Sequence, residues 1–337
     1  MPIIEVRHVS KEFQSSRTWR LGGSRATRAV NDVSLSVEPG LVYGLVGESG
    51  SGKTTLGRLM LGLVAPTAGQ ILFEGRDISK FSRVESLEFR RRAQLIMQNP
   101  YSALNPRRTI EDSLKVGIEV HRLASGRAKR ERLVAILEQV GMGPEALSRY
   151  PHEFSGGQRQ RLVIARALAV EPSLIIADEA VSALDVSIQA QVLNVLRGLQ
   201  RQLGFTLLLI SHDLRVIYHM SDQIGVMYLG KLVEQAPKRE LYERPLHPYT
   251  KELITAAPRL EPGSAPQRLI RGELMDVLPP PDGCVFTPRC SMALPECAGI
   301  IPDLEEKAPA HTVACWRVPV AALDSPPPPA VASGPFS

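Results

Sequence analysis

The chain has 337 residues, 44% of them hydrophobic and few of them aromatic, as expected for a soluble α/β protein of one large or two modest domains. The net charge of +5 is compatible with nucleotides, nucleic acid or an anionic membrane face, and it selects none of them. The N-terminus has no basic region followed by an apolar one, and every apolar run is too short to span a bilayer. We therefore expect no signal peptide, no membrane helix and no disulfide.

The predicted elements begin with two half-buried antiparallel strands, "IIEVRHV" and "DVSLSVE", in which apolar and polar residues alternate. Continuous apolar runs then predict buried strands at "LVYGLV", "AQLIMQ", "SLIIAD" and "FTLLLIS". Helical periodicity follows in "TTLGRLMLGLV", "RERLVAILEQV", "QRQRLVIARALA" and "IQAQVLNVLRGLQRQL". Strands that alternate with helices predict an α/β fold with a mostly parallel sheet.

Composition divides the chain into regions. The pattern of residues 99–168 is mainly helical, so we interpret this stretch as a helical subdomain inserted into an α/β domain of residues 1–245. Prolines and all four cysteines collect in an extension at 246–320, and a proline-rich tail at 321–337 is expected to be disordered. The chain has no internal repeat, which favours a single unit over a tandem pair.

The segment "GESGSGKTT", residues 47–55, follows a predicted strand and precedes a predicted helix, which is the context that a phosphate-binding P-loop requires. Its glycines let backbone N–H groups turn onto phosphate oxygens, and the helix directs its positive end at the anion. The alternative is a glycine-rich turn with an exposed lysine. We expect nucleotide phosphates and Mg²⁺ to be bound by Gly47, Ser49, Gly50, Ser51, Gly52, Lys53, Thr54 and Thr55, with Lys53 on the terminal phosphates and Thr54 on the metal.

An acidic pair ends the predicted strand "SLIIAD". Asp178 is placed to hold Mg²⁺ through water, and Glu179 can orient and polarise the attacking water. Alone, such a pair is more often a solvated turn or a helix cap. Beside a P-loop it favours nucleotide hydrolysis.

A second pair of glycines opens a predicted helix in "HEFSGGQRQRLVIARAL". The order P-loop, "SGGQ", Asp-Glu, "SALD" and "SHDL" resembles that of the ATP-binding cassette (ABC) ATPases. In that family two cassettes pack head to tail, and the signature of one covers the γ-phosphate held by the P-loop of the other. The resemblance therefore implies that the second cradle serves a partner's nucleotide, and that ATP joins the two subunits until it is hydrolysed.

The resemblance assigns further residues by position. The signature is Ser155, Gly156, Gly157 and Gln158, and the loop that crosses to the partner site ends at Asp185. Gln98 matches the glutamine that senses the γ-phosphate and Mg²⁺, and His212 matches the histidine that contacts the γ-phosphate. Phe13 matches the aromatic that stacks on adenine, with Trp19 and Tyr43 as rivals. The departures are Phe154 for leucine, Ala180 and Val181 for Pro-Thr, and Asn99 for Asp, and none of them removes a reacting group.

Two further stretches narrow the family. "NPYSALNPR" and "RPLHPYTKELITAAP", followed by "GCVFTPRC", are similar to segments of the peptide and nickel importer ATPases. This implies a second, related ATPase as partner, two transmembrane subunits above the pair, and an extracytoplasmic solute-binding protein. It also implies a peripheral position on the cytoplasmic face of the inner membrane, with dipeptides, oligopeptides, nickel or a related solute as cargo.

The four cysteines have the spacing C-x5-C-x6-C-x17-C at Cys284, Cys290, Cys297 and Cys315. This is not the paired C-x2-C of common zinc modules, and spacing alone leaves a metal site and free buried thiols equally open. The resembled extension carries a [4Fe–4S] cluster, so the resemblance favours iron–sulfur over zinc. His311 is an alternative ligand, although we expect it to be an exposed loop histidine.

A different class of function is an ABC ATPase that acts on nucleic acid. Such proteins carry long coiled-coil insertions or zinc fingers between the cassette halves, and the insertion here is short and lacks sustained heptads. The basic runs "FRRRAQ" and "RAKRER" lack interleaved aromatics, which favours solvated helix faces, so no nucleic-acid partner is expected. A non-catalytic regulatory module is opposed by the intact Lys53, Asp178, Glu179 and His212.

Overall fold

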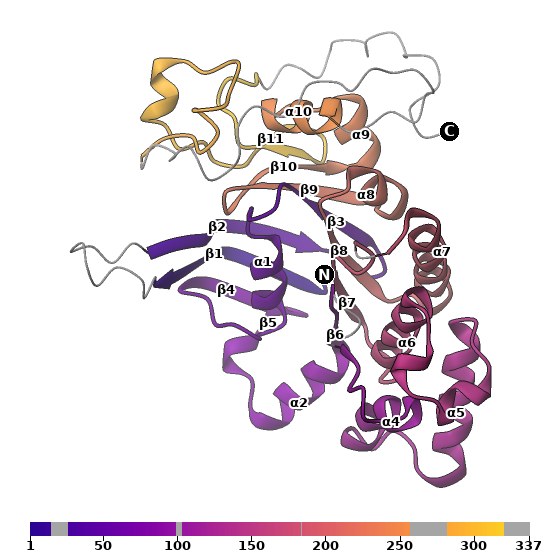
Figure 1. The fold of residues 1–337 in the computed structure, drawn as a ribbon. Helices are drawn as coiled ribbons and strands as arrows, with labels where there is room; N and C mark the ends of the chain where they lie inside the picture. The colour runs from indigo at the N-terminus through magenta and orange to yellow at the C-terminus, as the bar shows by residue number, and fades with distance from the viewer. Residues whose placement is uncertain (15–25, 99–102, 183, 257–281, 320–337) are drawn as a thin grey trace, which may run out of the picture.

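The computed structural model describes residues 1–14, 26–98, 103–182, 184–256 and 282–319, which form two β-sheets flanked by helices (Figure 1). The smaller sheet is antiparallel. Its strands, in spatial order, are β2 (Ala26–Val37), β1 (Ile4–Gln14), β4 (Ala68–Phe73) and β5 (Arg76–Asp77). The predicted alternating strands are the pair β1 and β2, with Val6 opposite Leu35, and both of these residues face the core.

The larger sheet has eight strands and contains the four predicted buried strands. In spatial order they are β11 (Glu305–Ala308), β12 (His311–Val313), β10 (Lys231–Pro237), β9 (Gln223–Tyr228), β3 (Val42–Val46), β8 (Thr206–Ser211), β7 (Leu174–Asp178) and β6 (Ala93–Ile96). The run from β9 to β6 is parallel, and β10, β12 and β11 join it as antiparallel strands. The predicted α/β fold with a largely parallel sheet is therefore confirmed.

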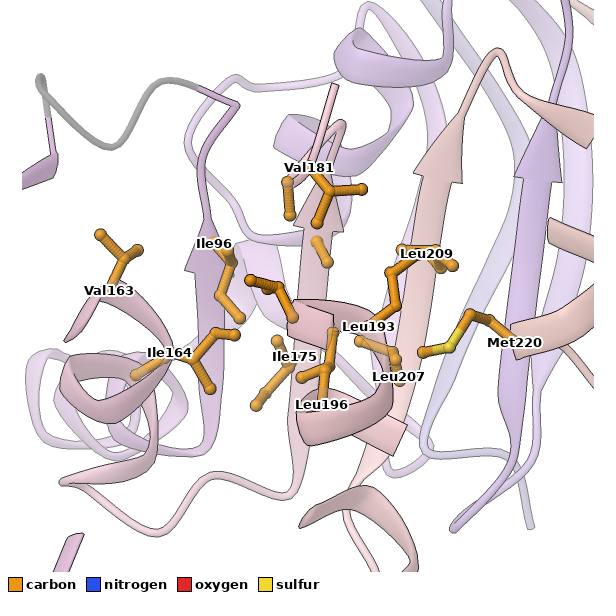
Figure 2. Close-up of a cluster of buried hydrophobic side chains, with 14 of the residues drawn as sticks. Ile96, Val163, Ile164, Ile175, Val181, Leu193, Leu196, Leu207, Leu209 and Met220 are labelled. Carbon is orange, nitrogen blue, oxygen red and sulfur yellow. The ribbon is translucent and has the colours of Figure 1, made fainter. Parts of the chain in front are cut away.

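Two hydrophobic clusters cover opposite faces of this sheet. Because side chains alternate along a strand, Ile175 and Leu207 belong to one cluster and their neighbours Ile176 and Leu208 to the other. The helices α6 (Gly156–Leu168) and α7 (Val186–Leu203) pack on the first face, where Figure 2 shows their side chains against those of β6, β7 and β8. The helix α1 (Lys53–Met60) packs on the second face, together with the inner face of the antiparallel sheet.

Most of the remaining described helices lie towards the two ends of the molecule, and α8 (Leu214–Met220) packs against β3 and β8 instead (Figure 1). Those towards the ends are α2 (Arg83–Arg92), α4 (Ile110–Val120), α5 (Gly126–Gln139), α9 (Lys238–Glu243) and α10 (Pro248–Ala256). Helices α4, α5 and α6 contact one another in the stretch that we interpreted as a helical insertion. Among the described residues, no helix is both long and apolar enough to cross a bilayer.

The C-terminal extension joins the large sheet through a buried polar contact. Strand β12 pairs with β10, and the His311 ring lies 2.7 Å from the Glu234 carboxylate. Glu234 also accepts hydrogen bonds from the backbone N–H groups of Leu246 and His247, so its fully buried carboxylate is satisfied. The prediction of an exposed loop histidine at 311 is therefore wrong, because this side chain is only 1% exposed and anchors the extension. The predicted disordered tail at 321–337 lies outside the described residues.

Candidate functional site

Four of the predicted motifs meet at one edge of the large sheet because of its topology. The P-loop follows β3, Gln98 lies two residues after β6, Glu179 follows β7, and His212 follows β8. These four strands are parallel and adjacent, in the order β3, β8, β7, β6, so their carboxyl ends lie side by side. Such an edge is where open α/β sheets bind their ligands.

The P-loop enters α1 through a tight turn at Gly52. Its backbone has φ of +101°, and a Cβ there would lie 2.2 Å from the carbonyl oxygen of Ala29, so only glycine fits. Ser49 and Gly50 are exposed, whereas Gly47 and Ser51 are buried and Thr55 is half-buried. The N–H of Gly230 donates to the Ser51 carbonyl, which ties the loop to the turn between β9 and β10.

Lys53 is folded onto its own loop. Its Nζ donates to the carbonyl oxygens of Gly47 and Glu48, at 2.7 Å each, and to Ser51 Oγ at 3.1 Å. Burial lowers the pKa of Lys53 to about 8, while the nearby carboxylates of Glu179, Asp178 and Glu48 act in the opposite direction. The ammonium group is thus held by neutral oxygens, which the charged oxygens of a phosphate can replace.

Thr54 and Asp178 face each other across the site. The Thr54 hydroxyl donates to Asp178 Oδ1 at 2.9 Å. Burial raises the pKa of the Asp178 carboxyl, and the hydrogen bond from Thr54 opposes that shift. This pair supplies two oxygen ligands of the kind that Mg²⁺ prefers.

Glu179 lies at the centre of a three-residue group. Its Oε2 accepts from Gln98 Nε2 at 3.0 Å, and its Oε1 lies 3.1 Å from His212 Nδ1. The backbone of Glu179 has φ of +46°, and its N–H donates to the Ile210 carbonyl on β8. This left-handed conformation is uncommon for a residue with a side chain, and it places the carboxylate between Gln98 and His212.

The signature residues form the start of α6. Ser155 is the N-cap and closes a capping box, in which its Oγ accepts from the Gln158 N–H and its own N–H donates to Gln158 Oε1. A Cβ on Gly157 would lie 2.4 Å from Ile188 Cγ2, so this glycine lets α7 approach α6 closely. Ser155 and Gln158 are exposed at this helix start.

The signature and the P-loop do not share a face of the sheet. Helix α1, which begins at the P-loop, packs on the face lined by Ile176 and Leu208, whereas α6 packs on the face lined by Ile175 and Leu207. Asp185 is exposed next to Val186, whose side chain is 77% exposed. The two candidate phosphate cradles are therefore separate surfaces of this chain.

The aromatic candidates for adenine stacking differ in exposure. Phe13 is 44% exposed, with Lys11 Nζ 5.2 Å from its ring centroid. Tyr43 is buried and its hydroxyl donates to Gln235, so it is not available to a nucleotide. Trp19 lies outside the described residues.

The four cysteines line one narrow cavity of about 20 Å³, which has room for roughly one water molecule. All four are free thiols, and among the described residues no group of three or more His, Cys, Asp or Glu side chains is placed to hold a metal ion. The expected iron–sulfur cluster is therefore not supported by the thiols as they are placed in this structure. His311, the alternative ligand, is engaged by Glu234.

Sequence patterns missed one residue set at the site. Glu48, at a freely variable position of the P-loop motif, bonds to Arg289 and Tyr249 of the C-terminal region. No local signal marks this contact, because Arg289 is 241 residues further along the chain.

Comparison with known proteins agrees with this geometry. A family model described as "ABC transporter" matches residues 30–182, and one described as "Oligopeptide/dipeptide transporter, C-terminal region" matches residues 233–297. The oligopeptide transport ATP-binding protein AppF of Bacillus subtilis is 48% identical over 319 residues, which cover 93% of this chain and 96% of AppF. A Brucella ovis protein named for peptide import and ATP binding is 47% identical, over 94% of this chain and 98% of its own length.

Solved structures of ATP-binding cassettes have the same fold. The cassette MJ0796, in a dimeric post-hydrolysis state bound to ADP and Pi, aligns with a TM-score of 0.61 and 26% identity, over 70% of this chain and 99% of that one. The cbiO1 protein of Clostridium perfringens, part of the transporter complex cbiONQ, has a TM-score of 0.61 and 23% identity, over 72% of this chain and 91% of its own. The fold, the order of the motifs and the 48% identity with AppF over 93% of this chain lead to one conclusion. The chain belongs to the ABC transporter ATP-binding proteins, in the branch with the oligopeptide/dipeptide C-terminal region, and is an ABC-type ATPase.

Proposed function

We propose that this ATPase powers the uptake of dipeptides or oligopeptides through partner membrane subunits. The observation that carries the proposal is the similarity to AppF, an oligopeptide transport ATP-binding protein, which is 48% identical over 93% of this chain. The aligned part includes the C-terminal region of this chain. Nickel or a related small solute is the alternative cargo. The ATPase would then act as a peripheral protein on the cytoplasmic face of the inner membrane.

In the proposed site, ATP binds with its phosphates on the P-loop. Lys53 exchanges its loop partners for phosphate oxygens, and Thr54 and Asp178 hold Mg²⁺. Mg²⁺ commonly binds one or two protein oxygens together with phosphate oxygens and water, so this pair is a sufficient protein ligand set, with the Gln98 side-chain oxygen as a further candidate. Bound Mg²⁺ would neutralise charge that develops on the phosphates.

Glu179 is the proposed general base, which orients and polarises the attacking water. Its carboxylate is 19% exposed and lies within hydrogen-bonding distance of Gln98 and His212. These two neighbours fix its orientation in this structure. When ATP binds, they are the residues that can turn towards the γ-phosphate, which makes the base sensitive to the nucleotide.

The signature acts on the nucleotide of a second chain in this proposal. Ser155, Gly156, Gly157 and Gln158 lie at an exposed helix start, and α6 packs on the face of the sheet opposite to α1. A helix start directs backbone N–H groups at an anion, so it suits the γ-phosphate held by a partner. We propose a pair with a related ATPase, formed on ATP binding and released on hydrolysis, with Asp185 close to the shared interface.

The helical region is the proposed docking site for a membrane subunit. Two hollows, of about 730 and 280 Å³, share the lining residues Met97, Ala103 and Arg166, close to Gln98. A helix from the membrane subunit seated there would be adjacent to the glutamine that meets the nucleotide. Movement at the nucleotide site would then be coupled to the membrane subunit.

The transport proposal is tested by purifying the chain with its sister ATPase and two membrane subunits in lipid. We expect the solute-binding protein loaded with a di- or oligopeptide to raise the rate of ATP hydrolysis, and the same protein with a nickel chelate not to do so. If the binding protein raises the rate of ATP hydrolysis when loaded with a nickel chelate but not when loaded with a peptide, nickel replaces peptide as the proposed cargo. Stimulation of the chain by duplex DNA would favour the nucleic-acid alternative.

A metal at the four cysteines is a separate proposal, and it requires the cavity to open. The support for it is that all four thiols line the same space. Anaerobic purification followed by iron, sulfide and zinc analysis tests it. A colourless sample without iron or zinc would exclude both metals.

A further inference from the structure

The P-loop is tied to the C-terminal extension through Glu48. Arg289 donates from Nη1 and Nη2 to the two Glu48 carboxylate oxygens, both at 2.9 Å. The Glu48 N–H donates to the Tyr249 hydroxyl at 3.0 Å, and the Glu48 carbonyl accepts from Lys53 Nζ at 2.7 Å. Side chain, N–H and carbonyl of this one P-loop residue are therefore all held, two of them by residues beyond 245.

Arg289 is itself fixed. Its side chain is 5% exposed, and its guanidinium lies 5.5 Å from the centroid of the Tyr228 ring and 5.9 Å from that of Phe286. Tyr249 completes this aromatic group, with its ring centroid 4.6 Å from Tyr228 and 5.5 Å from Phe286. A bidentate pair whose arginine is buried among aromatic rings allows only one arrangement of the two side chains. The pair therefore fixes the position of Glu48 in addition to neutralising its charge.

Attachment of the extension does not depend on this pair alone. Strand β12 pairs with β10, and the buried Glu234 holds His311 together with the backbone at Leu246 and His247. The Arg289–Glu48 pair is a separate contact, and it meets the domain at the phosphate loop itself. Because of this location, we expect the pair to affect the nucleotide site in addition to the stability of the fold.

We propose that Arg289 is a positioning residue for ATP binding, so that the C-terminal extension completes the P-loop of its own chain. By holding Glu48, Arg289 keeps the first turn of the loop in the conformation that receives phosphate, and ATP binding does not have to order it. The inference rests on ATP binding at the P-loop and not on which solute is transported.

The test compares the effect of a variant on the Kd and KM for Mg-ATP with its effect on kcat. An ordered P-loop is needed both to bind ATP and to hold the transition state, so its loss weakens the binding of both alike. In Arg289→Gln we expect the Kd of Mg-ATP, measured by calorimetry, and the KM to rise about tenfold, the order for losing hydrogen bonds to a charged group. The kcat at saturating ATP should stay within about twofold.

The matched control is Arg239→Gln, which breaks the exposed Arg239–Glu243 pair on α9. It should leave Kd, KM and kcat unchanged. If Arg289 is only an anchor, Arg289→Gln lowers the melting temperature while folded protein keeps the wild-type Kd, and that result overturns the proposal.

Two further variants keep the test decisive should Arg289→Gln not fold. Tyr249→Phe removes only the hydroxyl that holds the Glu48 N–H and should raise Kd about threefold to tenfold. Glu48→Gln removes the partner charge, and in that background Arg289→Gln should add little to the rise in Kd, because the two effects share one contact. Unchanged Kd in Tyr249→Phe and Glu48→Gln, or fully additive effects, would refute the proposal.

Discussion

Replacing Glu179 with glutamine tests the chemistry at the end of β7. The substitution keeps the size and shape of the side chain, and it removes the carboxylate that lies 3.0 Å from Gln98 Nε2 and 3.1 Å from His212 Nδ1. One of the two acceptor oxygens becomes an amide donor, and Gln98 can meet it by turning its own amide. We therefore expect the free energy of unfolding to change by less than about 1 kcal/mol.

The expected loss is in turnover. A positioned general base contributes about 10²- to 10⁴-fold, which corresponds to about 2.7 to 5.4 kcal/mol of transition-state stabilisation at 1.36 kcal/mol per tenfold. Glu179→Gln should thus release phosphate at least about 100-fold more slowly in single-turnover experiments with saturating Mg-ATP. Its Kd for Mg-ATP should stay within about threefold of the wild-type value, because the P-loop contacts are intact.

Glu171→Gln is the matched control for the backbone. Glu171 has φ of +52°, close to the +46° of Glu179, and its side chain is 69% exposed. The control should hydrolyse ATP at the wild-type rate. Phosphate release by Glu179→Gln within about threefold of wild type would refute the assignment of the base, and equal losses in both variants would indicate damage to the fold.

Three other outcomes follow from the site. Burial lowers the pKa of Lys53 to about 8, and only its ammonium form pairs with phosphate. The affinity for ATP, measured by calorimetry, should therefore be full below that pH and about tenfold weaker by about pH 9. Lys53→Arg should remove this decline. Gly157→Ala places a Cβ 2.4 Å from Ile188 Cγ2, so urea unfolding should show a loss of about 1–3 kcal/mol, part of which Ile188→Ala recovers. Ser155→Ala should cost about 1 kcal/mol as a lost N-cap, and it should slow hydrolysis by the paired ATPases without changing the Kd of the isolated chain for ATP; unchanged hydrolysis would contradict the two-chain site.

The residues around Glu179 were predictable partly from local patterns and partly from the resemblance to ABC ATPases. The P-loop and the acidic pair follow continuous apolar runs that predict strands, whereas Gln98 and His212 were assigned by the resemblance. The spatial order β3, β8, β7, β6, which brings the four strand ends to one edge, is a finding of the structure. The glycines of the P-loop are likewise constrained by a turn that other residue types make poorly, and its lysine is constrained by the charge of the phosphates.

The contacts of the extension were not predictable for the opposite reason. Glu234 and His311 are 77 residues apart in the sequence, and Glu48 and Arg289 are 241 residues apart. The sequence around each of these four residues contains no motif that predicts the contact. Histidine is intermediate in its tendency to be buried, and nothing near His311 in the sequence indicates its contact with Glu234, so the expectation that His311 is exposed was wrong. The burial of Tyr43, by contrast, agrees with the buried strand predicted at "LVYGLV", and it removes Tyr43 from the candidates for adenine stacking.

The separation of α1 and α6 has a consequence for regulation. One sheet carries the P-loop helix on one face and the signature helix on the other, with Ile176 and Ile175, adjacent in β7, packing towards opposite sides. A rigid, close-packed layer of this kind cannot fold over to bring its own Ser155 to its own Lys53. In the proposed two-chain site, an isolated chain would bind ATP through its P-loop, and contact of the signature with a γ-phosphate would need a second chain. Hydrolysis that depends on such a contact is intrinsically coupled to assembly.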